Sequence, residues 1–381
     1  MKNIDKIIYF DNAATSFPKP PRVLSGVTRC IAEYCGNPGR SSHRLSVAAS
    51  EAIFEARSAA AALFGCKKPE NVVFTLNATY ALNIAIRSFV RRGDRVLISN
   101  IEHNSVIRPL HAIGANTEVF DSFKDKQEII ADVERRLQSG LDAVVCNHAS
   151  NICSAVNPVE DIGSLCRRYG VRFIVDASQS AGHRRIDISK LKADAVCAPF
   201  HKGLFGIQGG GFVIFGEGIR HELIPVFVSG GNGMTAFDPS MPDILPERLE
   251  AGTLPTPAAV SLIRGIGYIN EIGLEEINRR EEAVSRRIED MLSSTKGIAV
   301  YGNVSAGGST ILFNAEGLTS YELADRLDRY GICTRAGFHC SPLAHQKLGT
   351  GESGAVRLSF SCFNDVREAD RFYRALKQII S

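Results

Sequence analysis

Short apolar runs alternate with amphipathic stretches through the middle of the chain, between about residues 70 and 215. Five runs are apolar almost throughout: NVVFT, RVLIS, LDAVVCNHA, VRFIVDA and DAVCAP. Continuous apolar character without alternation is typical of parallel strands that are covered on both faces. Apolar residues recur at helical spacing in the segments between them, such as TYALNIAIRSFV, NSVIRPLHAIGA and VEDIGSLCRRYG. This order predicts an α/β fold with a large doubly wound, mainly parallel sheet, to which GGGFVIFG adds an antiparallel strand.

The pattern changes on both sides of this region. A loop-rich segment at 226–256 follows it, and about the last hundred residues mix strands such as STILFNAE with helices such as SYELADRLDRYGI. This second pattern predicts a small α+β domain. We therefore expect a large domain at 15–255 and a small domain formed by 1–14 and 256–381. Helical periodicity also marks four longer segments, at 21–35, 44–65, 256–272 and 274–295.

The composition is that of an ordinary globular protein. The 44 basic and 41 acidic residues leave a net charge of +3, which argues against nucleic acid and against an anionic membrane surface as partners. No apolar run approaches the roughly 18 residues of a membrane span. The segment MKNIDKIIYFDNAATS lacks the apolar core of a signal peptide. From these features we expect a cytoplasmic protein.

The ten cysteines lie far apart, without a CxxC pair or a Cys/His cluster of zinc-site spacing, so no metal site is expected. Most lie in apolar stretches, as Cys197 does in ADAVCAPF, and are expected to be reduced thiols in the core. Cys340 differs, because its surroundings, RAGFHCSPLAH, predict a loop.

A lysine and an aspartate follow neighbouring apolar strands. Asp176 ends VRFIVD, and Lys202 stands 26 residues later in a glycine-rich loop after ADAVCAP. An acid and a lysine so placed suit pyridoxal phosphate: the amine condenses with its aldehyde, and the carboxylate keeps its ring nitrogen protonated. Either residue alone would more often be a helix cap or a surface charge. Together they predict an enzyme of amino-acid chemistry.

Two further strand ends carry candidate ligands. Ala78 and Thr79 open a helix directly after NVVFT, where free amides and the helix dipole favour a phosphate group. A plain cap by Asn77 or Thr79 is an equal alternative. His103 follows RVLIS, where an imidazole could stack on a pyridine ring and pass protons, although a loop histidine is the simpler interpretation.

Asn151 and Arg357 are candidates for substrate contacts. Asn151, after LDAVVCNHAS, could bond a ring hydroxyl or a substrate carboxylate, or could simply form a turn. Arg357 lies within the apolar strand AVRLSFSC, and a buried arginine needs an anionic partner. That partner is either a substrate carboxylate, gripped by two hydrogen bonds, or an internal acid.

Eight motifs in register across nearly the whole chain resemble the class V aminotransferase family, and within it the cysteine desulfurases and selenocysteine lyases. They are YFDNAATS at 9–16, IEHNSV at 101–106, HASN at 148–151, VDASQSAGH at 175–183, HKGLFGIQGGG at 201–211, RLEAGT at 248–253, RAGFHC at 335–340 and RLSFSCFN at 357–364.

The resemblance implies the pyridoxal-phosphate fold type I and assigns a role to each candidate. Lys202 would bind the cofactor aldehyde, and Asp176 would face its ring nitrogen. Arg357 would hold the substrate carboxylate. The further cofactor ligands would be Gln179 at the ring hydroxyl, His103 stacked on the ring as an acid/base, and Thr79 and His201 at the phosphate. Thr253 would reach the phosphate of a partner subunit, which implies a homodimer.

Cys340 matches the family nucleophile, which takes sulfur from L-cysteine as a persulfide and leaves L-alanine. His339 and Arg335 are expected to lower its pKa through their positive charge. The short run GFHCSPL resembles the desulfurase branch that commonly requires a protein sulfur acceptor.

The chain departs from the family pattern at three places. Pro199 and Phe200 replace a Ser or Thr and a Gly before the His-Lys pair, which removes a phosphate hydroxyl. NATY replaces the more usual Gly-Thr-Thr-Glu, and GNPGRSSH mixes features of both desulfurase branches.

The alternative functions are a selenocysteine lyase, another β-eliminating or transaminating relative, or a non-catalytic sulfur-relay or cofactor-binding protein. The Lys202–Asp176 pair argues against the non-catalytic alternative. The acceptor and the pathway stay open.

Overall fold

The computed structural model describes residues 7–39, 41–228, 237, 239–302 and 308–381 of the chain. Its largest element is a seven-stranded sheet with the order β2-β8-β7-β6-β5-β3-β4. The predicted antiparallel strand is confirmed, because β8 runs against both of its neighbours while the remaining neighbouring pairs are parallel. The strands are β2 (Val72–Thr75), β3 (Arg95–Ser99), β4 (Asn116–Phe120), β5 (Ala143–Asn147), β6 (Arg172–Asp176), β7 (Ala195–Pro199) and β8 (Gly211–Phe215).

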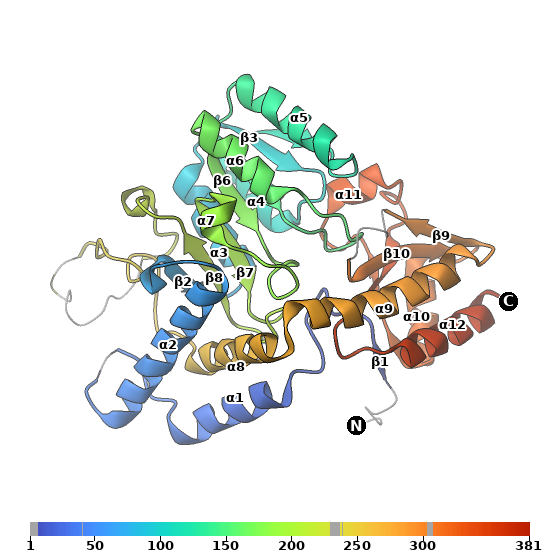
Figure 1. Ribbon diagram of the computed structural model, residues 1–381, viewed down its shortest axis with the longest axis horizontal. Helices are drawn as coiled ribbons and strands as arrows, with labels where there is room; N and C mark the ends of the chain where they lie inside the picture. The colour runs from blue at the N-terminus through green and yellow to red at the C-terminus, as the bar shows by residue number, and fades with distance from the viewer. Residues whose placement is uncertain (1–6, 40, 229–236, 238, 303–307) are drawn as a thin grey trace.

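Helices cover both faces of this sheet (Figure 1). Alternate strand residues join two separate apolar clusters, one with α2, α5, α6, α7 and α8, and the other with α3 and α4. This explains why the strands read as continuous apolar runs, since both faces are buried. The helices are α1 (Pro21–Glu33), α2 (Arg44–Leu63), α3 (Ala78–Phe89), α4 (Asn104–Ile113), α5 (Lys126–Gln138), α6 (Val159–Tyr169), α7 (Ile188–Leu191) and α8 (Thr256–Ile272).

A second, antiparallel sheet has the order β12-β13-β10-β9 and packs against α9, α10 and α12 on the right of Figure 1. Residues 8–9 form β1, which pairs with β11 and brings the N-terminal segment to this part of the molecule. The elements are α9 (Leu274–Ser293), β9 (Ile298–Tyr301), β10 (Thr310–Ala315), α10 (Ser320–Arg329), β11 (Ile332–Cys333), β12 (Arg335–Gly337), α11 (Pro342–Lys347), β13 (Ala355–Ser359) and α12 (Val366–Ile380).

The α/β fold class is confirmed, and the division into two domains stays a prediction. Within that division, α8 packs on α1 and α2 and contributes apolar residues to the core under the large sheet. Part of the loop-rich segment 226–256, namely 229–236 and 238, lies outside the described residues. No helix in the described part of the chain is long and apolar enough to cross a membrane.

Candidate active site

A cavity of about 100 Å³ lies beyond the carboxyl ends of the large sheet's parallel strands, where ligands of such sheets bind. Eight of the predicted residues line it: Ala78, Thr79, His103, Asn151, Asp176, Gln179, His201 and Lys202. The other three do not: Thr253 is exposed in a loop, Arg357 is buried in β13, and Cys340 is exposed in the turn between β12 and α11.

Lys202 and Asp176 meet in this cavity because their strands, β7 and β6, are neighbours. Asp176 is only 2% exposed, and its carboxylate accepts the backbone amide of Ser178 over 2.9 Å. Burial lowers the pKa of Lys202 to about 8, Asp176 acts in the opposite direction, and Arg357 and Arg335 lower it further. A far larger fraction of this amine is therefore neutral near pH 7 than of an ordinary lysine.

The segment around residues 13–19 holds the Lys202 loop in place. Four donors converge on the carbonyl oxygen of His201: the amide and hydroxyl of Ser16, the hydroxyl of Thr15 and the ammonium of Lys19. The Ser16 hydroxyl also lies 3.0 Å from the carbonyl oxygen of Lys202. Through these contacts, the motif YFDNAATS helps to fix the backbone from which Lys202 projects.

The start of α3 offers donors to an anion. Asn77 is the N-cap, and its side chain accepts the amide of Tyr80, so the capping interpretation is confirmed. Ala78 and Thr79 follow it on the cavity wall, where the first amides of a helix have no partner within the helix. A Cβ on Gly211 would lie 2.9 Å from the Ala78 nitrogen, so glycine lets β8 approach this helix end.

The hydroxyl expected before the His-Lys pair is absent here, as the sequence indicated. Phe200 does not line the cavity but packs against Phe74 and Phe212 in the core. The cavity instead carries the hydroxyls of Ser105 and Ser178, which were not predicted as site residues. Ser105 follows His103 by two residues in the first turn of α4, and Ser178 precedes Gln179 directly, so this nearness in sequence is the signal by which they could have been found.

His103 caps α4 and is held by Ser105. Its Nδ1 accepts the backbone amide of Ser105 over 3.0 Å and lies 2.8 Å from the Ser105 hydroxyl, which in turn lies 2.8 Å from the Thr79 hydroxyl. Burial, followed by the charge of Lys202, lowers the pKa of His103 to about 4. The ring is therefore neutral near pH 7.

Asn151 and Gln179 make contacts that differ from those expected of cofactor ligands. Asn151 donates to the carbonyl oxygen of His339 over 2.8 Å and accepts from the Ser341 hydroxyl over 2.7 Å. It thus holds the residues on both sides of Cys340. Gln179 donates to the carbonyl oxygen of Ala13 over 3.0 Å.

Cys340 sits in an exposed turn with an unusual backbone. Its φ is +57° and that of His339 is +50°, which is the left-handed region that few non-glycine residues adopt. The amide of Asn104, next to His103, donates to the carbonyl oxygen of Cys340 over 2.8 Å. The turn is therefore tied to the large sheet from two sides, by Asn104 and by Asn151.

The expectation that His339 supplies positive charge to Cys340 is wrong. His339 is only 3% exposed, and its ring nitrogens face His345 and the carbonyl oxygen of Arg335. Burial and the charge of Arg357 lower the pKa of His339 to about 3. His339 is therefore neutral near pH 7 and acts as part of the turn's support.

Arg357 has the internal acid that one of the two interpretations of a buried arginine requires. Its guanidinium forms an ion pair with Asp11 and donates to the carbonyl oxygen of Asn151 over 3.0 Å. Its Nε is buried and has no hydrogen-bond partner among the described residues. An internal acid thus neutralises the charge while one donor stays open.

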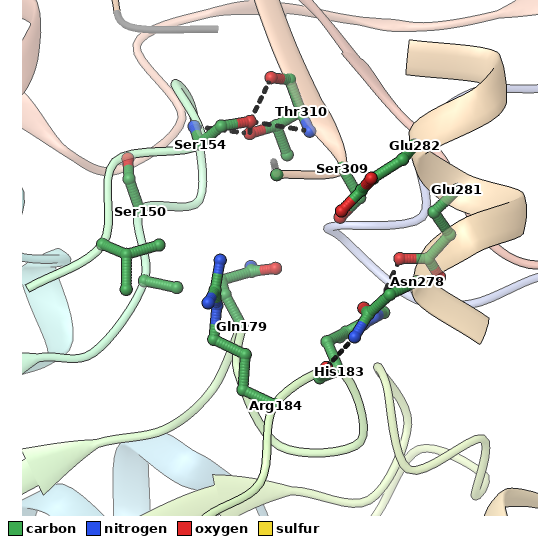
Figure 2. A pocket seen from close by; sticks show the side chains of 13 residues that line it. Ser150, Ser154, Gln179, His183, Arg184, Asn278, Glu281, Glu282, Ser309 and Thr310 are labelled. Carbon is green, nitrogen blue, oxygen red and sulfur yellow. Dashed lines mark hydrogen bonds and ion pairs between the residues drawn. The ribbon is translucent and has the colours of Figure 1, made fainter. Parts of the chain in front are cut away.

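A second cavity adjoins the first and shares Gln179 with it. Figure 2 shows that Arg184 and Glu282 reach into it from opposite walls, Glu282 from α9. On the α9 side of this cavity, His183 lies 3.0 Å from Glu281 of α9. This contact connects the two parts of the molecule.

The donor set of the first cavity fits pyridoxal phosphate. The Lys202 amine has a lowered pKa beside Asp176, and the Nδ1 of His201 is buried without a partner in the described part of the chain. The open amides at the start of α3 stand on the same wall. A lysine, a carboxylate and an anion site in one cavity define a class of α/β enzyme built around this cofactor.

Comparison with known proteins agrees with this class. The chain matches the family Aminotransferase class-V over residues 8–372 and belongs to it. It is 30% identical to a protein of Pyrococcus abyssi described as a "probable cysteine desulfurase", over 98% of this chain and 94% of that one. The structure of a cysteine desulfurase from Thermococcus onnurineus superimposes with a TM-score of 0.88, at 31% identity, over 99% of this chain and 95% of the other. A cystine C–S lyase bound to cysteine persulfide shares the fold, with a TM-score of 0.83 over 98% of each chain, at 20% identity.

Proposed function

We propose that this protein is a pyridoxal-phosphate-dependent cysteine desulfurase, which converts L-cysteine to L-alanine and keeps the sulfur as a persulfide on Cys340. The observation that carries the proposal is the pairing of the Lys202–Asp176 site with an exposed cysteine tied to the same strand ends through Asn104 and Asn151. Relatives named as cysteine desulfurases along almost the whole chain support it.

The cofactor would be held by residues at the ends of the strands. Lys202 would bind its aldehyde, Asp176 would face its ring nitrogen, and His103 would lie against its ring. Its phosphate would take the amides of Ala78 and Thr79 and the free Nδ1 of His201. When bound, the cofactor supplies an electron sink for negative charge that develops at the Cα of an amino acid.

Two neighbouring arginines are our candidates for binding the substrate. Arg357 has an open Nε, and Arg335 is its direct neighbour in the sheet. The positive charges of Arg357 and Arg335 lower the pKa of Lys202. We assign the substrate carboxylate to Arg357, and to the amine of Lys202 we assign the removal of the Cα proton, since its lowered pKa leaves a neutral fraction near pH 7.

The sulfur transfer then uses the thiolate of Cys340. Its Sγ attacks the Sγ of the substrate, an S–S bond forms, and the substrate's Cβ–Sγ bond breaks. The bonding electrons stay with the carbon fragment, which takes up protons and leaves as alanine, so cysteine and a thiol give alanine and a persulfide without an outside oxidant. Exposure of Cys340 suits the next transfer to an acceptor.

Three further features belong to the same proposal. Thr253 is exposed in its loop, as a residue that reaches the phosphate of a partner subunit in a homodimer would have to be. A protein sulfur acceptor would dock where Cys340 is exposed. We place the enzyme in the cytoplasm, where the thiols would stay reduced; all ten cysteines are unpaired in the structure.

Alanine release from L-cysteine, with and without a dithiol reductant, tests the function. Wild type should release alanine, and Cys340→Ser should bind the cofactor normally but release none. L-selenocysteine serves as the second substrate, because selenium leaves more easily than sulfur. Turnover of selenocysteine alone would identify a selenocysteine lyase, and equal turnover of cysteine by Cys340→Ser would move the enzyme to the β-eliminating or transaminating relatives.

A further inference from the structure

The side chains of Thr79, Ser105 and His103 form a hydrogen-bonded row along the wall of the first cavity. Thr79 Oγ1 lies 2.8 Å from Ser105 Oγ, which lies 2.8 Å from His103 Nδ1. The backbone amide of Ser105 reaches the same Nδ1 over 3.0 Å. Because His103 caps α4 and Thr79 stands in the first turn of α3, the row joins the starts of two helices.

The backbone amide fixes the direction of every bond in this row. An amide N–H can only donate, so the Nδ1 of His103 accepts and carries no proton. The Ser105 hydroxyl must then also donate to Nδ1, since two lone pairs facing each other at 2.8 Å would repel. With its own proton used, the Ser105 oxygen accepts from the Thr79 hydroxyl. Donation therefore runs from Thr79 through Ser105 to His103.

The charges around His103 keep its ring neutral. Burial and the ammonium of Lys202 lower its pKa to about 4, Arg335 and Arg108 act in the same direction, and Asp176 opposes them. A neutral imidazole carries one ring proton, and with two donors on Nδ1 that proton lies on Nε2. The ring therefore offers a hydrogen-bond donor at Nε2, where a general base would need a lone pair.

We propose that Ser105 is a positioning residue that holds His103 as the Nε2–H tautomer, so that His103 donates a hydrogen bond in the active site and does not accept the substrate's proton. To act as a base at Nε2, the ring would have to move its proton to Nδ1 and give up both donors from Ser105. The proton then goes to Lys202, which shares the cavity. This division of roles rests on the proposed function, whereas the tautomer does not.

The tautomer is measurable without turnover, by ¹⁵N spectroscopy of the full-length, cofactor-loaded protein labelled at histidine, with His103→Gln to assign the signals. In wild type, Nδ1 should give the signal of an unprotonated nitrogen and Nε2 that of a protonated one. Ser105→Ala keeps the backbone amide as one donor to Nδ1 but loses the hydroxyl, so the Nδ1–H tautomer should become detectable beside the Nε2–H tautomer, and the pH midpoint of the ring should rise because the neutral form loses a donor. Ser105→Thr keeps a hydroxyl and should restore the wild-type signals.

Ser178→Ala is the matched control, since Ser178 lines the same cavity without a hydrogen bond to His103 in the structure. It should leave the His103 signals unchanged. A wild-type ring with its proton on Nδ1 would overturn the proposal, and so would Ser105→Ala with wild-type signals. Because the wild-type spectrum decides the tautomer by itself, a poorly folding variant does not remove the test.

The role of the tautomer is tested by two replacements of His103. A glutamine amide donates from the position of Nε2 but cannot take up a proton, whereas alanine does neither. His103→Gln should keep about tenfold more turnover of L-cysteine than His103→Ala, the worth of one hydrogen bond. Equally low turnover in both variants would overturn the donor role. If wild type releases no alanine at all, the proposed function is wrong. The ¹⁵N spectrum still tests the tautomer of His103 independently of that outcome.

Discussion

Lys202 is partly buried beyond the end of β7, whereas Cys340 is exposed in a turn with left-handed backbone. The Lys202 loop is held mainly by donors to backbone carbonyl oxygens from residues 15–19. The Cys340 turn is held by the side chain of Asn151 on both flanks and by the amide of Asn104. One site is enclosed beside a carboxylate, and the other is presented to solvent.

The difference matches the tasks that we assign to the two sites. A lysine that must be neutral to react gains from burial, which disfavours its charged form. A cysteine that must pass sulfur to another molecule has to remain accessible, so its position depends on hydrogen bonds that orient the turn without covering the thiol. The two sites should therefore respond differently to substitution, in cofactor binding at the first and in sulfur transfer alone at the second.

The largest effect is expected for Lys202→Ala, which removes the only group that we assign to the cofactor aldehyde. Turnover and the covalently bound cofactor should both be lost. Visible absorption of the purified protein, before and after addition of pyridoxal phosphate, measures this. A variant that still acquires the yellow colour of the bound cofactor would contradict the assignment.

Asp176→Asn should reduce turnover far more than it weakens cofactor binding, because an amide cannot keep the ring nitrogen protonated. A charge-assisted hydrogen bond contributes about 1.5–3 kcal/mol, and the rate should fall by more than the roughly tenfold to hundredfold that this energy represents. Steady-state kinetics and a cofactor titration of the same variant separate the two effects. Near-normal turnover would exclude the proposed role of Asp176.

Asn151→Ala should act on the Cys340 turn and leave the Lys202 site unchanged. It removes two hydrogen bonds, worth about 2 kcal/mol together, so sulfur transfer should slow by about thirtyfold. Asn151→Asp is the matched variant, because it keeps an acceptor for Ser341 but sets a buried carboxylate oxygen against the carbonyl oxygen of His339; its loss should be at least as large. A large change in cofactor affinity in either variant would show instead that Asn151 is a cofactor ligand.

The smallest effect concerns the pH dependence of cofactor loading. Only the neutral amine of Lys202 attacks the aldehyde, and burial lowers its pKa to about 8. In cofactor-free protein, the loading rate should rise with pH by at most about tenfold per unit and level off above pH 8, well below the usual lysine value of about 10.4. The rate of appearance of the bound-cofactor colour measures this, with a simple lysine derivative as the control. A midpoint equal to that of the derivative would contradict the lowered pKa.

The strand ends were predictable because a parallel sheet brings the carboxyl ends of its strands together. Asp176 and His103, for example, follow strongly apolar strands, and this pattern by itself predicts that they lie at one edge of the sheet. Several elements between the predicted strands were missed, among them β4 and α5. The edge strand β4 (Asn116–Phe120) is largely exposed and polar, and α5 (Lys126–Gln138) carries many charges around a narrow apolar stripe.

The support of the site was not predictable from local pattern. Asn151 reaches His339 across 188 positions of the sequence, and Arg357 pairs with Asp11 across 346. The burial of His339, which removes its expected positive charge, also depends on His345 and on the packing of the turn. Such contacts follow from the fold as a whole, so sequence spacing carried no sign of them.

The central claim is that Cys340 takes sulfur from L-cysteine through the Lys202 site. The most direct test is mass spectrometry of the peptide that contains Cys340, after brief exposure of the loaded enzyme to L-cysteine without reductant or acceptor. Wild type should gain the mass of one sulfur atom on Cys340, and a dithiol should remove it, while Lys202→Ala should gain none. Alanine release without added sulfur on Cys340, or with the sulfur on another cysteine, would contradict the account.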